Sequence, residues 1–426
     1  CGVPFCQSGM TIKGMTSGCP LNNLIPEWND LLYTGNWEQA YHRLHKTSNF
    51  PEFTSRVCPA LCEKACTCGL NGKAVCTKEN EMAIIEHAYA KGYAKANPPK
   101  VRTKKRIAVV GSGPAGLTCA GDLAKLGYDV TIFEALHKAG GVLSYGIPEF
   151  RLPKSKVVDK EVENVKSLGV KIETDVVIGK AVTIDELLNE EGFDAVFVGS
   201  GAGLPRFMGI PGEDANGVFS ANEYLTRSNL MKAFDDSYDT PIARFKKVAV
   251  VGGGNVAMDA ARTALRLGAE VHVVYRRSEA ELPARAEEVH HAKEEGIIFD
   301  LLTNPTEILA DENGWVKGIK CVKMELGEPD ASGRRKPVEI EGSEFVMDLD
   351  AVIMSLGTSP NPLISSTTKG LEINKRKCIV AEEENGQTSK EGVYAGGDAV
   401  TGAATVILAM GAGKAAAKGI DEFLSK

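Results

Sequence analysis

The chain has 426 residues, of which 43% are hydrophobic and 25% charged, and these are ordinary values for globular domains. A length of this order accommodates two or three domains, each with a core of its own. The net charge of -7 does not indicate the basic surface that nucleic-acid-binding proteins have. No apolar run reaches about 18 residues. We therefore expect neither a nucleic-acid partner nor a membrane span.

Residues 1–100 form a cysteine-rich and mostly helical region. Apolar periodicity predicts short helices at 25–32 and 37–44 and a longer one at 80–94. A basic stretch with two prolines, at 96–106, follows as a domain boundary. Eight of the eleven cysteines precede position 77, namely Cys1, Cys6, Cys19, Cys58, Cys62, Cys66, Cys68 and Cys76.

The spacing of these cysteines favours metal ligation. Cys58, Cys62 and Cys66 follow one another at intervals of four residues. Cys19 and Cys58 each precede a proline, as the last cysteine of a ferredoxin-type run does. The paired C-x2-C knuckles that are typical of zinc sites do not occur in the sequence. The pattern favours iron–sulfur ligation over zinc, and over the disulfides of small secreted domains.

A strand, a glycine-rich turn, a helix and a second strand follow at 107–134. Gly111, Gly113 and Gly116 form a Gly-x-Gly-x-x-Gly turn. In a βαβ unit such glycines permit a tight turn, the approach of a pyrophosphate and close packing of the helix on the strand. The second strand ends in Glu134, where a carboxylate binds a ribose 2′-hydroxyl. The order of these elements predicts a site for an adenine dinucleotide.

The next segments continue an alternation of strands and helices. Residues 140–154 read GGVLSYGIPEFRLPK and directly follow the strand that ends in Glu134, so we expect them to wrap a cofactor ring rather than form a plain surface loop. Residues 155–190 predict a helix, a strand and a helix. Residues 193–201 predict a buried strand that ends in small residues.

Residues 247–259 repeat the strand, glycine-rich turn and helix of the first site. The following strand carries Tyr275 in place of the acid, because it lies seven residues after a glycine, as Glu134 does. Arg276 and Arg277 come next. Two guanidinium groups suit a 2′-phosphate, which a carboxylate would repel. The pattern favours NADP(H) over NAD(H); the alternative is two solvated arginines at a strand end.

The C-terminal part completes the first nucleotide domain. Residues 297–350 alternate short strands with turns, and 349–361 repeat the pattern of 193–201. A strand then closes on Gly397 and Asp398, and a small-residue helix follows. An aspartate at such a strand end can hold the ribityl hydroxyls of a flavin.

We therefore predict an α/β protein with two Rossmann-like FAD/NAD(P)-binding domains, one inserted in the other, preceded by a helical cysteine-rich iron–sulfur domain. The predicted divisions are 1–100 for the cluster domain, 101–240 with 350–426 for the FAD-binding domain, and 241–349 for the NADPH-binding domain.

Seven short segments carry a resemblance to a known family. They are CGVPFC (1–6), GCPLN (18–22), FPEF (50–53), RVCPA (56–60), YGIPEFRLPK (145–154), GGGNVAMD (252–259) and YRRS (275–278). Together they resemble the small (beta) subunit of NADPH-dependent glutamate synthase, over nearly the whole chain. The same module occurs in the N-terminal part of dihydropyrimidine dehydrogenase and in the large subunit of the bifurcating ferredoxin:NADP oxidoreductase.

The resemblance implies two [4Fe-4S] clusters in the N-terminal domain. The implied ligands are Cys1, Cys6 and Cys66 for one cluster, and Cys19, Cys58, Cys62 and Glu81 for the other. The remaining ligand of the first cluster is, in the family, a cysteine three residues before Cys1, so we expect a truncated N-terminus or an incomplete cluster. Residues 10–17 form a stretch longer than in several relatives. The family gives no role to Cys68 or Cys76.

The resemblance also implies FAD at the first nucleotide site and NADPH at the second. The implied FAD residues are Gly111, Ser112, Gly113, Pro114, Ala115, Gly116, Glu134, Gly141, Leu143, Arg151, Gly201, Gly397, Asp398 and Thr405. The implied NADPH residues are Gly252, Gly254, Asn255, Val256, Arg276 and Arg277. No catalytic acid–base residues are needed, and we interpret the seven histidines as solvated helix residues.

The implied function is that of a cytoplasmic electron-input module. NADPH reduces FAD, and electrons pass singly through the clusters to the FMN-containing large subunit of glutamate synthase or to another electron-accepting flavoprotein. The main alternative is the electron-bifurcating oxidoreductase, which residues 217–227 also resemble. A thioredoxin-reductase-like enzyme needs a redox C-x-x-C that Cys119, Cys321 and Cys378 do not form. A zinc-stabilised interaction domain is the non-enzymatic alternative.

Overall fold

The computed structural model describes residues 1, 3–12, 15–329 and 333–426. These residues form two compact units. The first comprises 1–144, 149–202 and 360–426, and the second comprises 145–148 and 203–359. The predicted fold class is confirmed, because a helical N-terminal region is followed by two Rossmann-like parallel sheets. None of the helices in the described part of the chain is both long enough and apolar enough to cross a membrane.

The N-terminal part of the first unit is helical, as predicted. A short antiparallel pair, β1 (Met10–Ile12) and β2 (Met15–Ser17), precedes the helices; the two residues between the strands lie outside the described residues. The helices are α1 (Ile25–Tyr33), α2 (Trp37–His45), α3 (Pro51–Val57), α4 (Leu61–Lys64), η1 (Thr67–Leu70) and α5 (Thr77–Lys91). Trp28, Leu44, Phe53 and Ile84 are fully buried and form the centre of this part.

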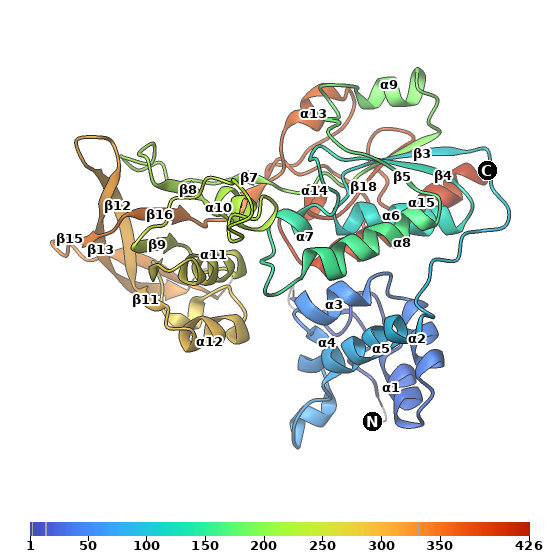
Figure 1. The fold of residues 1–426 in the computed structure, drawn as a ribbon, viewed down its shortest axis with the longest axis horizontal. Coiled ribbons are helices and arrows are strands. Elements are labelled where there is room, and N and C mark those ends of the chain that lie inside the picture. Colours follow the sequence, from blue (N-terminus) through green and yellow to red (C-terminus); the bar gives the residue numbers. More distant parts are fainter. Residues whose placement is uncertain (2, 13–14, 330–332) are drawn as a thin grey trace. The chain divides into compact units, whose positions relative to one another are not determined.

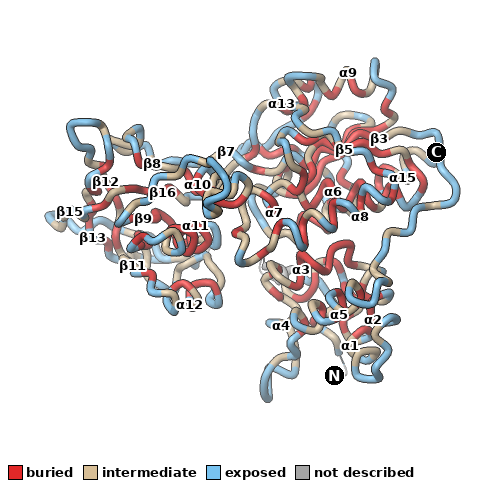
Figure 2. Tube along the Cα trace, viewed as in Figure 1, coloured by how far each residue is buried: buried red, intermediate tan, exposed pale blue. Residues whose placement is uncertain are grey.

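The first parallel sheet has the strand order β18-β6-β3-β4-β5. Its strands are β3 (Arg106–Val110), β4 (Asp129–Phe133), β5 (Lys171–Glu173), β6 (Ala195–Val198) and β18 (Val393–Ala395). Residues 107–110 and 195–198 are buried, as the apolar runs predict for central parallel strands (Figure 2). Sequence-distant β6 and β18 pair in parallel, so the C-terminal segment completes this sheet.

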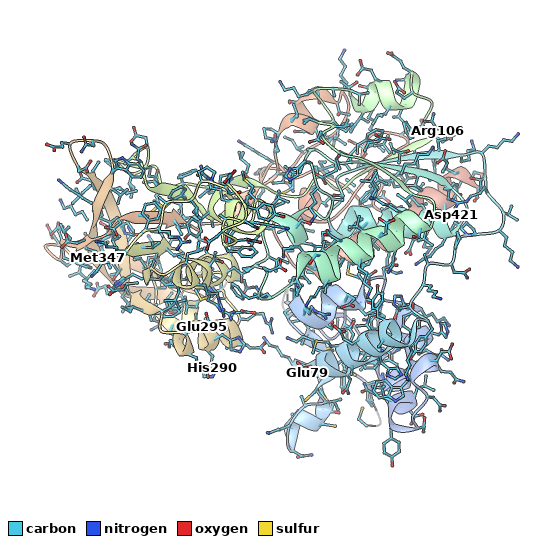
Figure 3. All side chains as sticks on the ribbon, viewed as in Figure 1. Glu79, Arg106, His290, Glu295, Met347 and Asp421 are labelled. Atoms are coloured by element: carbon cyan, nitrogen blue, oxygen red, sulfur yellow. The ribbon has the colours of Figure 1, made fainter. Side chains whose placement is uncertain are left out.

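Helices surround this sheet. They are α6 (Pro114–Lys125), α7 (Val142–Tyr145), η2 (Lys154–Val158), α8 (Asp159–Ser167), α9 (Ile184–Asn189), α13 (Leu363–Thr367), α14 (Asp398–Thr401) and α15 (Val406–Leu424). Helices α6 and α15 lie side by side (Figure 1), and a Cβ added at Gly413 would overlap the backbone of Ala115. Asp421, labelled in Figure 3, accepts a hydrogen bond of 2.8 Å from the Tyr128 hydroxyl. Small residues on α15 therefore permit close contact between two helices far apart in sequence.

Polar contacts join the helical region to the first sheet within this unit. Lys414 Nζ lies 3.1 Å from the Asp122 carboxylate and 3.0 Å from the Asn49 side-chain oxygen. The Asn49 amide in turn donates to Asp122 at 2.7 Å. The bend between α2 and α3, helix α6 and helix α15 are thus connected at one point.

The second unit contains another parallel sheet, with the order β11-β10-β9-β16-β8. Its strands are β8 (Val218–Ser220), β9 (Lys247–Val251), β10 (Glu270–Tyr275), β11 (Ile298–Leu301) and β16 (Ala351–Met354). Its helices are α10 (Ala221–Asn229), α11 (Asn255–Arg266), η3 (Glu279–Glu281) and α12 (Ala286–Glu294). Buried Arg262 of α11 pairs with Glu295, labelled in Figure 3 after α12, at 2.7 Å.

An antiparallel sheet occupies the region where short strands and turns were predicted. It consists of β12 (Thr303–Ala310), β13 (Val316–Pro329), β14 (Arg335–Glu339) and β15 (Phe345–Asp348). A further pair, β7 (Leu204–Pro205) with β17 (Thr358–Ser359), belongs to the same unit. Residues 203–240, which the predicted divisions place in the FAD-binding domain, lie in this second unit, because β8 pairs with β16. The three-domain division stays a prediction.

Candidate nucleotide and iron–sulfur sites

The first glycine turn lies between β3 and α6, and other parts of the backbone pack closely against it. Gly111 has φ +96°, and an added Cβ there would lie 2.6 Å from the carbonyl oxygen of Gly199. A Cβ at Gly116 would overlap the carbonyl oxygen of Gly111. Neither position accepts a side chain, so both glycines serve the tight turn and the packing of helix on strand that the sequence predicts.

Gly113 differs from these two glycines. It precedes Pro114 at the start of α6 in an extended conformation, with φ −68° and ψ −178°. Within the described residues, nothing beyond its chain neighbours would come within 4 Å of a Cβ added there. Open space therefore faces the N-terminus of a 12-residue helix, where backbone N–H groups and the helix dipole favour an anion. This arrangement fits the pyrophosphate of a dinucleotide.

Glu134 is buried at the end of β4, and its carboxylate is oriented by the turn. It accepts N–H hydrogen bonds from Ser112 and Leu136, both at 2.9 Å, and a further bond from the Ser112 hydroxyl. The Ser112 oxygen also accepts the N–H of Gly140 at 2.9 Å. An ionised carboxylate has about four acceptor positions. These three bonds leave one position, which fits a ribose hydroxyl.

The segment after Glu134 returns to the same turn. A Cβ at Gly141 would lie 2.8 Å from the Cα of Gly113, so the two backbones touch. The Leu143 side chain is fully buried and belongs to the core. Arg151 is half-buried, and Gly201, at φ +71°, faces open space after β6. Gly141 is thus part of the site by geometry, whereas only the backbone of Leu143 remains available to a ligand.

The C-terminal segment reaches the site after β18. A Cβ at Gly397 would lie 3.0 Å from the Cβ of Ala115, at the start of α6. Asp398 accepts the N–H of Ala404 at 3.2 Å, and burial raises the pKa of its carboxyl to about 6. Thr405 caps the N-terminus of α15. The structure therefore brings residues of three distant segments, around 111–116, 134–141 and 397, to one place.

The second glycine turn repeats this arrangement between β9 and α11. A Cβ at Gly252 would overlap the backbone of Ser355, whereas nothing beyond the chain neighbours in the described residues would lie within 4 Å of one at Gly254. The side-chain oxygen of Asn255 accepts the N–H of Arg285 at 2.9 Å, so it holds a loop of the protein. Val256 is exposed in the first turn of the helix. The open space at Gly254 again fits a pyrophosphate.

The end of β10 collects arginines. Tyr275 is buried, and its ring lies against Gly253, where an added Cβ would come within 2.8 Å of it. Arg276 is exposed, and Arg277 Nε donates to the carbonyl oxygen of Arg335 at 2.9 Å. Arg334 Nη2 donates to the Tyr275 hydroxyl at 3.1 Å. The sequence analysis missed this contact, because about sixty residues separate the strand end from the hairpin that carries Arg334.

One set of predicted cluster ligands lies together in the helical region. Cys19, Cys58 and Glu81 are buried. Burial, and then the charges of Cys58, Cys19 and Glu81, raise the pKa of the Cys62 thiol. Burial raises the pKa of Glu81 to about 8, although the Thr54 hydroxyl donates to it at 2.6 Å. These four residues therefore lie within electrostatic reach of one another.

The other set includes a residue that the sequence analysis left without a role. Burial, and then the charge of Cys66, raise the pKa of the Cys6 thiol, and Cys68 raises it further. The backbone of Val75 lowers the pKa of Cys66, and hydrogen bonds from Cys68 and Gly69 add to this effect. The Cys1 thiol is exposed and lies 3.8 Å from the carbonyl oxygen of Val3. Cys68 follows Cys66 in a C-x-C pair, and this spacing is the sequence signal that could have assigned Cys68 to the same set.

Among the residues that the structure describes, no three His, Cys, Asp or Glu side chains are arranged to hold one metal ion. In a [4Fe-4S] cluster each thiolate binds a different iron atom. The two thiol sets have the donor chemistry for clusters, since they consist of thiols and a buried carboxyl.

Two further predictions concern the histidines and the three cysteines outside the N-terminal region. The interpretation of all histidines as solvated helix residues was wrong for three of them, of which His137 is exposed but lies in a bend. His272 lies in β10, with Nδ1 2.7 Å from the Asp300 carboxylate, and burial lowers the pKa of His45 to about 3. Cys119 and Cys321 are buried on α6 and β13, in different units, and Cys378 is buried as well. Buried thiols on separate elements do not form the redox pair of a thioredoxin-reductase-like enzyme.

Solved structures with this fold include FprA from Mycobacterium tuberculosis in complex with NADPH. The TM-score is 0.63 at 20% sequence identity, and the match covers 76% of this chain and 85% of FprA. At this identity the likeness concerns the fold alone.

Three relatives match over nearly the whole chain. The oxidoreductase AegA of Escherichia coli (strain K12) is 41% identical over 95% of this chain. The beta subunit of the NADP(+)-dependent formate dehydrogenase of Moorella thermoacetica is 38% identical over 98% of it. The chain spans 62% and 61% of the lengths of these two proteins. The glutamate synthase [NADPH] small chain of Bacillus subtilis (strain 168) is 38% identical, with 100% of this chain and 89% of the relative covered.

Two families match separate parts of the chain. The family described as pyridine nucleotide-disulphide oxidoreductase matches residues 105–413. The family described as dihydropyrimidine dehydrogenase domain II, 4Fe-4S cluster, matches residues 5–93. The chain therefore has an FAD/NAD(P)-binding part and a 4Fe-4S cluster domain, and it belongs to the family of the glutamate synthase small chain, whose members are NAD(P)H-, FAD- and iron–sulfur-dependent electron-transfer subunits.

Proposed function

We propose that the chain oxidises NADPH and delivers the electrons, through FAD and two [4Fe-4S] clusters, to the large subunit of glutamate synthase. The match to the glutamate synthase [NADPH] small chain of Bacillus subtilis, 38% identical over 100% of this chain, supports this partner. The large subunit forms glutamate from 2-oxoglutarate and glutamine.

The first nucleotide site is assigned to FAD. The open space at Gly113 and the N-terminus of α6 receive the pyrophosphate, Glu134 receives a ribose hydroxyl, and Asp398 receives the ribityl chain. When bound, FAD exchanges electrons in pairs with NADPH and singly with iron–sulfur clusters. The protein positions these cofactors, and the electron transfer between them requires no catalytic acid–base residue.

The second nucleotide site is assigned to NADPH. The observation that carries this assignment is the contrast between two equivalent strand ends. β4 ends in a buried carboxylate that already binds the turn, whereas β10 ends in Tyr275 followed by Arg276 and Arg277. A 2′-phosphate is repelled at the first strand end and attracted at the second.

The cysteine sets are assigned to the clusters. Cys19, Cys58, Cys62 and Glu81 hold one cluster, and Cys1, Cys6 and Cys66 contribute to the other. The electrostatic grouping within the helical region supports the first set fully, and it supports Cys6 and Cys66 in the second. Cys6, Cys19 and Cys58 are buried, and burial of these thiols excludes water from the ligands and helps to set the potential.

Replacing Arg276 and Arg277 together by alanine is expected to raise KM for NADPH by about tenfold to a hundredfold, since hydrogen bonds to a charged group are worth about 1.5–3 kcal/mol. KM for NADH should change little, because NADH lacks the phosphate. Steady-state dye reduction with both nucleotides measures this. Arg266→Ala, an arginine on α11 that pairs with Glu295 at 2.9 Å, is the matched control. An equal effect on both nucleotides would remove the 2′-phosphate assignment.

The partner is tested by reconstitution. The purified holoprotein is mixed with a glutamate synthase large subunit, and NADPH oxidation is followed with 2-oxoglutarate and glutamine. We expect oxidation that depends on both substrates and yields glutamate. Parallel assays with ferredoxin plus a small flavoprotein, and with a formate dehydrogenase catalytic subunit, test the two alternative partners. Activity only in one of these assays would overturn the glutamate synthase assignment.

A further inference from the structure

The β13–β14 hairpin contributes to the corner where β10 ends. Tyr275 is the last residue of that strand, and Arg334 Nη2 donates both to its hydroxyl, at 3.1 Å, and to the carbonyl oxygen of Glu281, at 3.2 Å. The Tyr275 hydroxyl donates to the same carbonyl oxygen at 2.8 Å. Arg334 is half-buried, so its guanidinium is held beside the strand end.

Four arginines belong to the segments that form this corner. Arg276 and Arg277 follow the strand, and Arg334 and Arg335 come from the hairpin. The carboxylate of Glu281 accepts from Arg335 Nε at 2.9 Å and from the Ser278 hydroxyl. The four guanidinium groups come from two segments that meet near the end of β10, and positive charge gathered in this way favours an anionic ligand.

The corner is also continuous with the glycine turn. The Tyr275 ring and Leu282 lie against Gly253, where an added Cβ would come within 2.8 and 2.7 Å of them. Tyr275 therefore touches the turn with its ring and Arg334 with its hydroxyl. In this class of fold the end of the second strand binds the 2′ position of the adenosine ribose. Arg334 thus lies where a 2′-phosphate is recognised.

We propose that Arg334 is a specificity-determining residue that binds the 2′-phosphate of NADPH together with Arg276 and Arg277. The inference rests on the proposed NADPH site. A guanidinium presents its N–H donors in a planar fork, which suits bidentate pairing with a phosphate. The antiparallel hairpin, inserted after the nucleotide-binding strands, thereby takes part in the choice between NADPH and NADH.

The test compares two fragments of the cofactor, 2′,5′-ADP and 5′-AMP, by calorimetric titration of the full-length holoprotein. Arg334→Ala is expected to weaken 2′,5′-ADP about tenfold or more and to change 5′-AMP less than about twofold. Arg334→Gln keeps a donor for the Tyr275 hydroxyl without the charge and should show the same selective loss. Tyr275→Phe removes the hydroxyl but keeps the ring against Gly253, and it should retain the preference for 2′,5′-ADP.

Two outcomes would overturn the inference. Arg334→Ala could weaken both fragments equally, which would mean that Arg334 only supports the loop. Arg334→Gln could bind 2′,5′-ADP as the unmodified protein does, which would exclude a role for the charge. The Arg276 and Arg277 double variant separates this inference from the proposed function. If that variant keeps its preference for NADPH, the site assignment itself fails; if it loses the preference while the Arg334 variants keep theirs, only the role of Arg334 is wrong.

Discussion

Cys58→Ser is expected to abolish one [4Fe-4S] cluster while NADPH still reduces dyes through FAD. Cys58 is buried at the end of α3, in the set with Cys19, Cys62 and Glu81. A serine hydroxyl stays protonated at neutral pH and does not replace a thiolate ligand of iron. Iron and acid-labile sulfide should fall by about half, since one of two expected clusters is lost. FAD content and NADPH-dependent dye reduction should stay close to those of the unmodified protein, because the nucleotide-binding residues lie on other elements.

A cysteine in the same region gives the matched control. Cys76 is exposed just before α5, and Cys76→Ser should keep the full iron content. If Cys58→Ser folds, keeps FAD and yet no longer reduces dyes with NADPH, the proposed order of carriers is wrong. Zinc without iron in the unmodified protein would instead support the zinc-stabilised alternative.

The glycine turns and buried strands were predictable because their signals are local. The apolar run at 107–110 became β3, and the run after Lys247 became β9, each followed by glycines that the packing requires. Predicted helices at 25–32 and 37–44 match α1 and α2 within one residue. The helix predicted at 80–94 begins earlier, at Thr77, and ends at Lys91, because Gly92 adopts a left-handed conformation with φ +76°.

The features that the sequence did not predict depend on pairing between distant residues. Val218–Ser220 is too short to show an alternation, and its pairing with β16 places it in the second sheet. Arg334 reaches Tyr275 only through the hairpin, and Cys68 of η1 raises the pKa of the Cys6 thiol although the two residues are far apart in sequence. Asn255 was predicted to contact a cofactor, yet its side chain holds the backbone of Arg285. The position of a residue relative to a sequence motif does not predict such contacts.

Gly113→Ala and Gly254→Ala form a matched pair that is expected to separate cofactor binding from folding. Both glycines have negative φ in extended backbone, at −68° and −90°, which alanine adopts without strain. A methyl group at either position meets no described protein atom within 4 Å, chain neighbours aside. The melting temperature of the cofactor-free protein should therefore stay within about 2 °C, since a surface substitution usually changes stability by less than about 0.5 kcal/mol.

The same methyl group would occupy the space that a pyrophosphate needs. Gly113→Ala should thus abolish FAD binding, seen as loss of the flavin absorption after purification, whereas Gly254→Ala should keep FAD and lose reduction by NADPH. Gly116→Ala gives the opposite pattern, because its methyl group would overlap the carbonyl oxygen of Gly111 and cost about 1–3 kcal/mol of stability. Normal FAD content in Gly113→Ala would contradict the assignment of this turn. An exchange of the two phenotypes between Gly113→Ala and Gly254→Ala would mean that the two nucleotide sites have been assigned in the wrong order.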